Sequence, residues 1–137
     1  EMQKIEIYKK ISCIEDKKDI KYIREELIDR FSDIPKEVEC LIKISYIRAL
    51  GRKLGFSQIK EVGENVIFEY ENKDYADNGS FDYILNNYSE NIVFNSGDKP
   101  SFSYKIIGEE KNYLLDKFII LLENLIKESS ILKFNKS

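Results

Sequence analysis

The chain has 137 residues, of which 42% are hydrophobic and 34% charged, and its formal net charge at pH 7 is -3. This composition is typical of one soluble globular domain that is large enough to bury a core, and it excludes a disordered or membrane-embedded chain. The net charge provides none of the basic surface with which nucleic-acid binders neutralise phosphates. We therefore expect no direct nucleic-acid partner.

The supply of metal ligands and nucleophiles is small. The sequence has no histidine and two cysteines, Cys13 and Cys40, which excludes the common zinc sites and a Ser-His or Cys-His catalytic pair. We interpret the cysteines as buried thiols in a reducing cytoplasm. The most apolar segment, 113–126, contains charged residues and is too short to span a bilayer. We expect a cytoplasmic protein with no membrane contact, no catalytic residue, no cofactor and no metal.

The first half of the chain has apolar residues at helical spacing. The pattern predicts helices at about 3–14, 17–31 and 35–54. Residues 16–19 supply turn and capping side chains before the second helix, and Gly55 stands where a left-handed cap would end the third.

After Gly55 the pattern changes to short alternating or β-branched runs. The predicted elements are strands at 58–62 and 65–71 joined by a turn at Gly63-Glu64, a helix at 81–88, strands at 91–95 and 101–107, and a helix at 109–128. We predict an α+β fold, with three N-terminal helices followed by strand-strand-helix-strand-strand-helix. Residues 1–137 are expected to form a single compact domain.

The second predicted helix carries two different faces. Its apolar stripe, which we expect to face the core, consists of Ile20, Ile23, Leu27 and Phe31. Glu26, Asp29 and Arg30 have the spacing that gathers them beside this stripe as a compact charged patch. Carboxylates at Glu25, Glu26 and Asp29 would also suit acid-base chemistry or a Mg²⁺ site, but such a group is more often a solvated helix face. Asp33 is the expected N-cap of the following helix, with Pro35 in its first turn.

Four runs of residues together resemble a known family. They are 4–11, the Glu-Glu-Leu-Ile-Asp-Arg-Phe run at 25–31, Ile-Pro-Lys-Glu-Val at 34–38, and Leu-Gly-Phe at 54–56. Their order and spacing resemble the C-terminal domain of the bacterial transcription-repair coupling factors, the Mfd family. The match covers about the first 56 residues, and Ser32 stands where the family pattern has a glycine.

The resemblance implies a regulatory, autoinhibitory role. Such a C-terminal domain belongs to a large ATP-dependent DNA translocase of transcription-coupled nucleotide excision repair. It docks on the parent protein's UvrB-like module and masks the surface that binds UvrA. The residues that match the family's contact positions are Glu26, Asp29 and Arg30. The resemblance also implies that the motor and the parts that bind DNA and RNA polymerase lie outside this chain, which is itself expected to be a non-enzymatic fragment of a longer protein.

Two alternatives stay open at this point. One is an unrelated cytosolic protein-binding α+β module, which would have no affinity for a UvrB-like partner. The other is a small enzyme, which would require a convergent polar pocket in the strand-rich half of the chain, where no motif is evident.

Overall fold

The computed structural model describes residues 2–76, 80–88 and 90–136, with side chains at 4–76, 82–88 and 90–129. The elements in chain order are helices α1 (Met2–Ser12), α2 (Lys17–Phe31) and α3 (Lys36–Leu54), strands β1 (Phe56–Val62) and β2 (Asn65–Tyr70), helices α4 (Lys73–Ala76) and α5 (Ser80–Tyr88), strands β3 (Ile92–Asn95) and β4 (Ser101–Lys105), and helix α6 (Lys111–Lys136). The predicted α+β class and element order are confirmed, with α4 as an addition.

Local side-chain chemistry sets the ends of α2 and α3. The Asp16 carboxylate caps α2 by accepting a 3.0 Å hydrogen bond from the backbone N–H of Asp19. Gly55 ends α3 in the left-handed conformation, with φ 83°, as predicted. The prediction for Asp33 is wrong. Pro35 occupies the N-cap position, and the Asp33 carboxylate instead accepts the backbone N–H of its neighbour Ile34 at 2.8 Å.

Several predicted boundaries need correction. The first helix ends at Ser12, before the predicted residue 14, and the last one continues past 128 to Lys136. The segment 72–79, between the strand predicted at 65–71 and the helix predicted at 81–88, has no predicted element but contains α4, and its residues 77–79 lie outside the described part of the chain. The signal for α4 was the Asn72 side chain, which accepts the backbone N–H of Asp74 at 3.0 Å.

The strands form one antiparallel sheet in the order β1-β2-β4-β3. Phe68 at the centre of β2 lies opposite Ile59 of β1 and Phe102 of β4. Because side chains directly opposite each other share one face, these three point toward the helices. Side chains of the other parity, such as Lys60 and Val93, are exposed on the opposite face. The sheet therefore has one face on the core and one toward solvent.

An aromatic cluster fixes α6 across the sheet. The rings of Phe68 and Phe102 stack with their centroids 4.7 Å apart, and Phe118 of α6 meets Phe68 edge-on at 5.2 Å. Phe68 and Phe102 are fully buried, and burying a side chain of this size contributes about 1.5–3 kcal/mol. The sheet and α6 thus share a single core.

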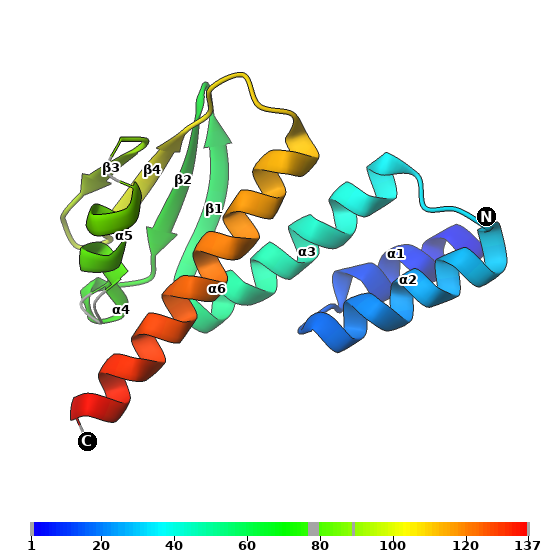
Figure 1. Cartoon of the computed structure of the whole chain (residues 1–137), viewed down its shortest axis with the longest axis horizontal. Helices are drawn as coiled ribbons and strands as arrows, with labels where there is room; N and C mark the ends of the chain where they lie inside the picture. Colours follow the sequence, from blue (N-terminus) through cyan, green and yellow to red (C-terminus); the bar gives the residue numbers. More distant parts are fainter. Residues whose placement is uncertain (1, 77–79, 89, 137) are drawn as a thin grey trace.

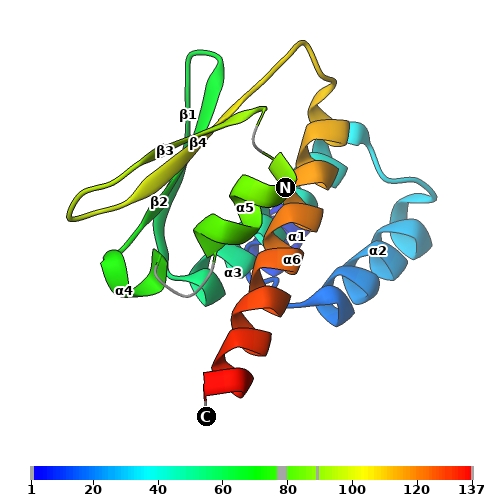
Figure 2. The same ribbon diagram turned by 60° about the vertical axis from the view of Figure 1, so that its left-hand side comes forward.

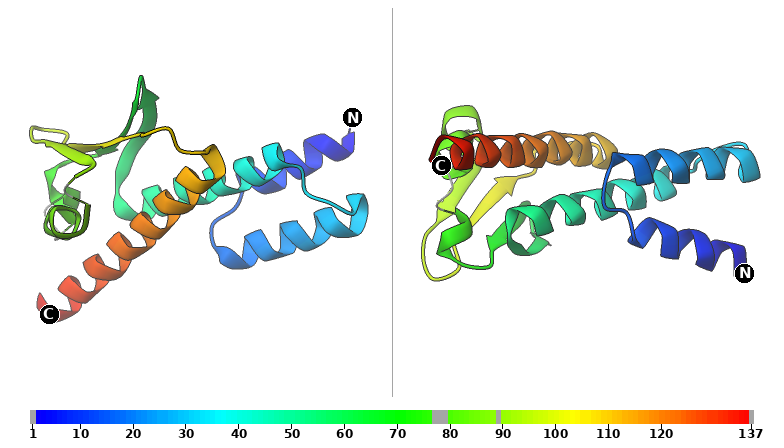
Figure 3. Two further views of the ribbon diagram at one scale, coloured as in Figure 1. Left: turned by 45° about the horizontal axis from the view of Figure 1, so that its top comes forward. Right: turned by 90° about the horizontal axis from the view of Figure 1, so that it is seen from below.

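The helices give the molecule two distinct ends. Helices α3 and α6 lie against the same face of the sheet, and α5 lies beside α6 (Figures 1 and 2). Helices α1 and α2 form an antiparallel pair that packs on α3 at the end of the molecule away from the sheet (Figure 3). Within the ranges described, no helix combines the length and apolar character needed to cross a membrane.

Candidate protein-interaction site

Glu26 lies at the centre of an ion-pair network that joins α1 to α2. Lys10 Nζ donates hydrogen bonds to Glu26 Oε1 at 2.8 Å and to Oε2 at 3.0 Å, and Arg30 Nη2 lies 3.2 Å from the same Oε1. The hydrogen bond from Lys10 lowers the pKa of the Glu26 carboxyl below its ordinary value of 4.5, and the charge of Arg30 acts in the same direction. The structure therefore brings Glu26 and Arg30 together and adds Lys10, which the sequence had not indicated.

Asp29 and Arg30 are the members of the patch that face solvent. The Arg30 side chain is 42% exposed, whereas that of Glu26 is 26% exposed. Asp29 is exposed and forms no ion pair with any residue in the described ranges. A free carboxylate beside a guanidinium that is held in place presents both signs of charge on one helix face.

The apolar stripe of α2 is only partly buried. Ile23 and Leu27 lie in the core, as predicted, but Phe31 is 47% exposed, so its assignment to the core is wrong. Phe31 is the last residue of α2, at the end of the molecule away from the sheet (Figure 3). The exposed ring of Phe31 adds apolar surface at the same end of α2 that carries Asp29 and Arg30, and apolar and charged surface together are typical of protein interfaces.

The cysteines differ from the prediction. Both are free thiols, but Cys13 is exposed and Cys40 is half-buried, so the interpretation of both as buried is wrong. Cys13 lies just after α1, in the connection to α2, where the chain is open to solvent. Across residues 4–76, 82–88 and 90–129, no group of acidic or cysteine side chains is placed to hold a metal ion.

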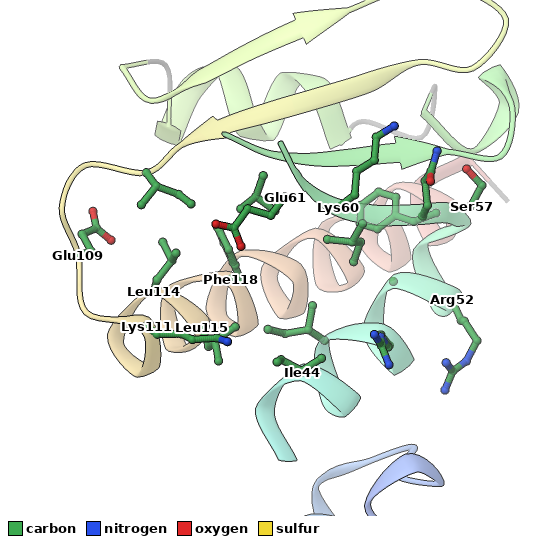
Figure 4. A pocket seen from close by; sticks show the side chains of 18 residues that line it. Ile44, Arg52, Ser57, Lys60, Glu61, Glu109, Lys111, Leu114, Leu115 and Phe118 are labelled. Carbon is green, nitrogen blue, oxygen red and sulfur yellow. The ribbon is translucent and has the colours of Figure 1, made fainter. Parts of the chain in front are cut away.

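A second feature, which the sequence analysis missed, is a groove of about 730 Å³ between α3, β1 and the start of α6. Its floor is apolar, with Ile44, Leu115 and Phe118 among its side chains, and charged side chains stand around its rim (Figure 4). The available signal was the pair Arg48 and Arg52, one helical turn apart on an otherwise apolar stretch of α3. It could not show that β1 would form the opposite wall.

The fold and the helix patch together define an α+β domain with a mixed-charge corner suited to protein docking. The family model described as the TRCF domain matches residues 1–80. The chain is 30% identical over 134 residues to the transcription-repair-coupling factor of Borreliella burgdorferi, which covers 95% of this chain and 12% of that protein. The chain belongs to the TRCF domain family.

Other relatives agree with this assignment. The transcription-repair-coupling factor of Rickettsia bellii is 30% identical over 118 residues, which is 82% of this chain and 10% of that protein. That of Staphylococcus aureus is 44% identical over 64 residues, or 47% and 6% respectively. The crystal structure of a C-terminal domain of transcription-repair coupling factor superposes with a TM-score of 0.80, covering 95% of this chain and 83% of that one, at 21% identity. The chain thus spans 12% or less of these curated relatives and shares the fold of that domain.

Proposed function

We propose that this chain is a regulatory interaction domain of a transcription-repair coupling factor, which docks on the UvrB-like module of the same protein and thereby masks the surface that would bind UvrA. In this proposal the motor and the contacts to DNA and RNA polymerase belong to parts outside these residues, in the bacterial cytoplasm. Membership of the family removes the alternative of an unrelated binding module.

The observation that carries the proposal is the arrangement of the patch on α2. Both oxygens of the Glu26 carboxylate are occupied within the domain, by Lys10 and Arg30. Glu26 is therefore a positioning residue that holds Arg30, while Asp29 and Arg30 are presented to the partner. We expect Asp29 to pair with a basic residue of the UvrB-like module and Arg30 with an acidic one.

Such an interface suits a contact that must open. Charge pairs at the rim of an interface set orientation and association rate more than they set final affinity. Masking requires only that the closed arrangement be favoured by a few kcal/mol, so that UvrA or a change elsewhere in the protein can displace it.

The experiment is calorimetric titration of the chain into the isolated UvrB-like module of its own parent protein, at low and physiological salt. We expect saturable binding that weakens with salt and falls by roughly two- to fivefold in Asp29→Ala and in Arg30→Ala, the effect usual for exposed ion pairs. Lys21→Ala is the matched control, because Lys21 is exposed on the same helix but lies about two turns before Asp29 and about 180° around the helix from Arg30.

Circular dichroism keeps loss of binding apart from loss of folding. If Asp29→Ala binds as well as the unsubstituted chain while Lys21→Ala does not, the docking face has been assigned to the wrong side of α2. A second measurement uses the whole parent protein, in which a covalent tether holds this domain at a high effective concentration near the UvrB-like module. If removal of this domain from the parent does not change the affinity for UvrA, the masking role is refuted.

A further inference from the structure

The groove beside β1 is bounded by the free edge of a β-sheet. β1 is the terminal strand, hydrogen-bonded to β2 alone. A strand that offered only one face to the groove would contribute alternate residues. Here six consecutive residues of β1, 56–61, line it, so the edge of the strand itself forms one wall. The opposite wall is α3 and the start of α6 (Figure 4).

The register shows which backbone groups the edge offers. The two-residue turn at Gly63-Glu64 makes Val62 and Asn65 a hydrogen-bonded pair, so the next pair, which contains Glu61, is a non-hydrogen-bonded one. The same alternation assigns Ile59 to a non-hydrogen-bonded pair. The N–H and C=O groups of Ile59 and Glu61 therefore point away from β2.

Bonds on the other strand confirm this alternation. The N–H of Tyr70 donates to Pro100, next to β4, at 2.8 Å, whereas the N–H of Glu71 donates to Gly55, next to β1, at 2.8 Å. Odd-numbered residues of β2 thus face β1, and their partners on β1 are the even-numbered ones. The outward-facing donors and acceptors of β1 have no partner strand in the described residues.

The rim charges of the groove are unevenly distributed. Its cations are Arg48, Arg52 and Lys111, and its anions are Glu61 and Glu109, whereas the charged end of Lys60 points away to the far face of the sheet (Figure 4). Glu109 is neutralised by Lys117 at 3.1 Å. Arg48 has no ion-pair partner in the described ranges, and Arg52 makes only a 3.4 Å contact to Glu15 in which both side chains are more than half exposed.

Arg48 and Arg52 therefore form a basic end of the groove. They lie on α3 on either side of Gly51, where an added Cβ would lie 3.2 Å from Cδ1 of Ile59 and 3.3 Å from Cδ2 of Phe56. Glu61 is further along β1, toward the turn, at the other end of the groove from Arg52 (Figure 4). An acidic side chain would be attracted to the Arg48 and Arg52 end and repelled at the Glu61 end.

We propose that this groove binds an extended segment of a partner protein, which adds to the sheet as a fifth strand beside β1. The segment's backbone pairs with Ile59 and Glu61, its inward side chains are apolar and fill the space between α3 and α6, and its acidic residues lie against Arg48 and Arg52. This mode of recognition combines main-chain hydrogen bonds for affinity with pockets for alternate side chains for specificity. It is separate from the α2 patch and does not depend on the docking proposed above.

A second copy of this chain fits the edge less well. Lys60 lies in the middle of the exposed strand, and the register shift between Phe56 and Gln58 bends its start, both of which are features that oppose edge-to-edge pairing of identical strands. Pairing of two copies through β1 would also bring the Arg48 and Arg52 side chains of both copies toward basic surface, so like charges would repel each other.

The test is an NMR titration of the chain with a short peptide in which valine and threonine alternate between a pair of glutamates at each end, so that either strand direction presents acid to the arginines. We expect saturable binding below about 1 mM, with the largest shifts at the amides of Ile59 and Glu61. The same peptide with N-methylated valines cannot pair with the edge, and we expect it to bind at least about tenfold more weakly.

Two variants probe the two walls. Glu61→Pro removes an outward N–H while leaving the β1–β2 bonds intact, and we expect it to weaken binding at least about tenfold relative to Glu61→Ala. Glu61→Ala removes only the carboxylate that repels the peptide's near glutamates, so it should bind at least as well as the unsubstituted chain. Arg48→Glu with Arg52→Glu should weaken binding similarly, whereas Lys73→Glu, which makes the same kind of charge change outside the groove, should not.

Four results would overturn the proposal: no saturable binding, equal binding of the N-methylated peptide, undiminished binding by a folded Glu61→Pro, or sedimentation of the chain as a dimer that masks the Ile59 and Glu61 amides. If Glu61→Pro fails to fold, the comparison of the two peptides on the unsubstituted chain decides the matter.

Discussion

Replacing Gly55 by alanine tests how tightly the α3–β1 junction is built. Gly55 has φ 83° and ψ 26°, a left-handed conformation that disfavours any residue with a Cβ. A Cβ at this position would lie 2.2 Å from Cγ and Cδ1 of Tyr75, on the neighbouring α4. The substitution therefore has two separate costs, backbone strain and displacement of an aromatic ring.

The magnitudes of the two costs can be estimated. The left-handed backbone costs an alanine about 1 kcal/mol. Moving the Tyr75 ring adds about 1–3 kcal/mol, the usual cost of overpacking, although the ring is 44% exposed and has room to turn. The sum is about 2–4 kcal/mol, or roughly 5–15 °C in melting temperature for a domain of this size.

Urea denaturation of a small variant set separates the two costs. Gly108 also has a positive φ of 56°, but nothing lies within 4 Å of a Cβ built there, so Gly108→Ala measures the backbone cost alone, about 1 kcal/mol. In a Tyr75→Ala background, Gly55→Ala should fall to the same value. If Gly55→Ala costs no more than Gly108→Ala in the unsubstituted chain, the packing of Tyr75 on Gly55 has been misjudged.

Three further substitutions probe the core and the buried or paired polar groups. Phe68→Ala should lose about 3–5 kcal/mol in urea denaturation, because Phe68 is fully buried against Phe102 and α6, and a loss under 1 kcal/mol would contradict that packing. Because the pKa of Glu26 is lower in the folded than in the unfolded state, its ion pair stabilises the folded state above pH 4.5, and this stabilisation is lost as the pH falls through the lowered pKa. Glu26→Gln should therefore make the stability of the chain depend less on pH in this acid range. An unchanged dependence would mean that the Lys10 pair has no effect in solution. Burial, together with the 2.7 Å hydrogen bond that Tyr46 donates to Glu123, raises the tyrosine pKa above its ordinary value of 10, so Tyr46→Phe should remove a loss of stability that sets in above pH 10.

The fold was predictable where local chemistry determines it. Helical spacing and the Asp16 cap define α2 to the residue, and alternation with a glycine turn defines the β1–β2 hairpin. The predictions that fail concern residues whose burial depends on contacts with parts of the chain that are distant in sequence. Phe31 has the spacing of a core residue, yet at the last position of α2 it stays 47% exposed.

The candidate site also has features that the sequence predicts and features that depend on packing between elements. The three patch residues are brought to one helix face by spacing alone, which a sequence shows directly. That Glu26 is satisfied by Lys10, and so acts within the domain, depends on the antiparallel packing of α1 on α2. The groove was invisible in the sequence because its two walls, α3 and β1, face each other only through the turn at Gly55 and the sheet register.

The left-handed conformation of Ser32 at the end of α2 offers a further test. Ser32 ends α2 with φ 66° and ψ -12°, the left-handed cap conformation, and donates its backbone N–H to the carbonyl of Ile28 at 2.8 Å. Glycine, which the family pattern has here, adopts this conformation without strain, whereas serine incurs a cost of about 1 kcal/mol.

Ser32→Gly should therefore stabilise the chain by up to about 0.5 kcal/mol, since the extra freedom of glycine in the unfolded state offsets about half of the gain or more. Ser32→Ala, which keeps the strain, serves as the control and should give no gain. Because the Ser32 side chain makes no hydrogen bond in the described part of the structure, neither change should alter docking through Asp29 and Arg30. Destabilisation by Ser32→Gly would mean that the left-handed cap is absent in solution and that α2 ends differently beside the patch.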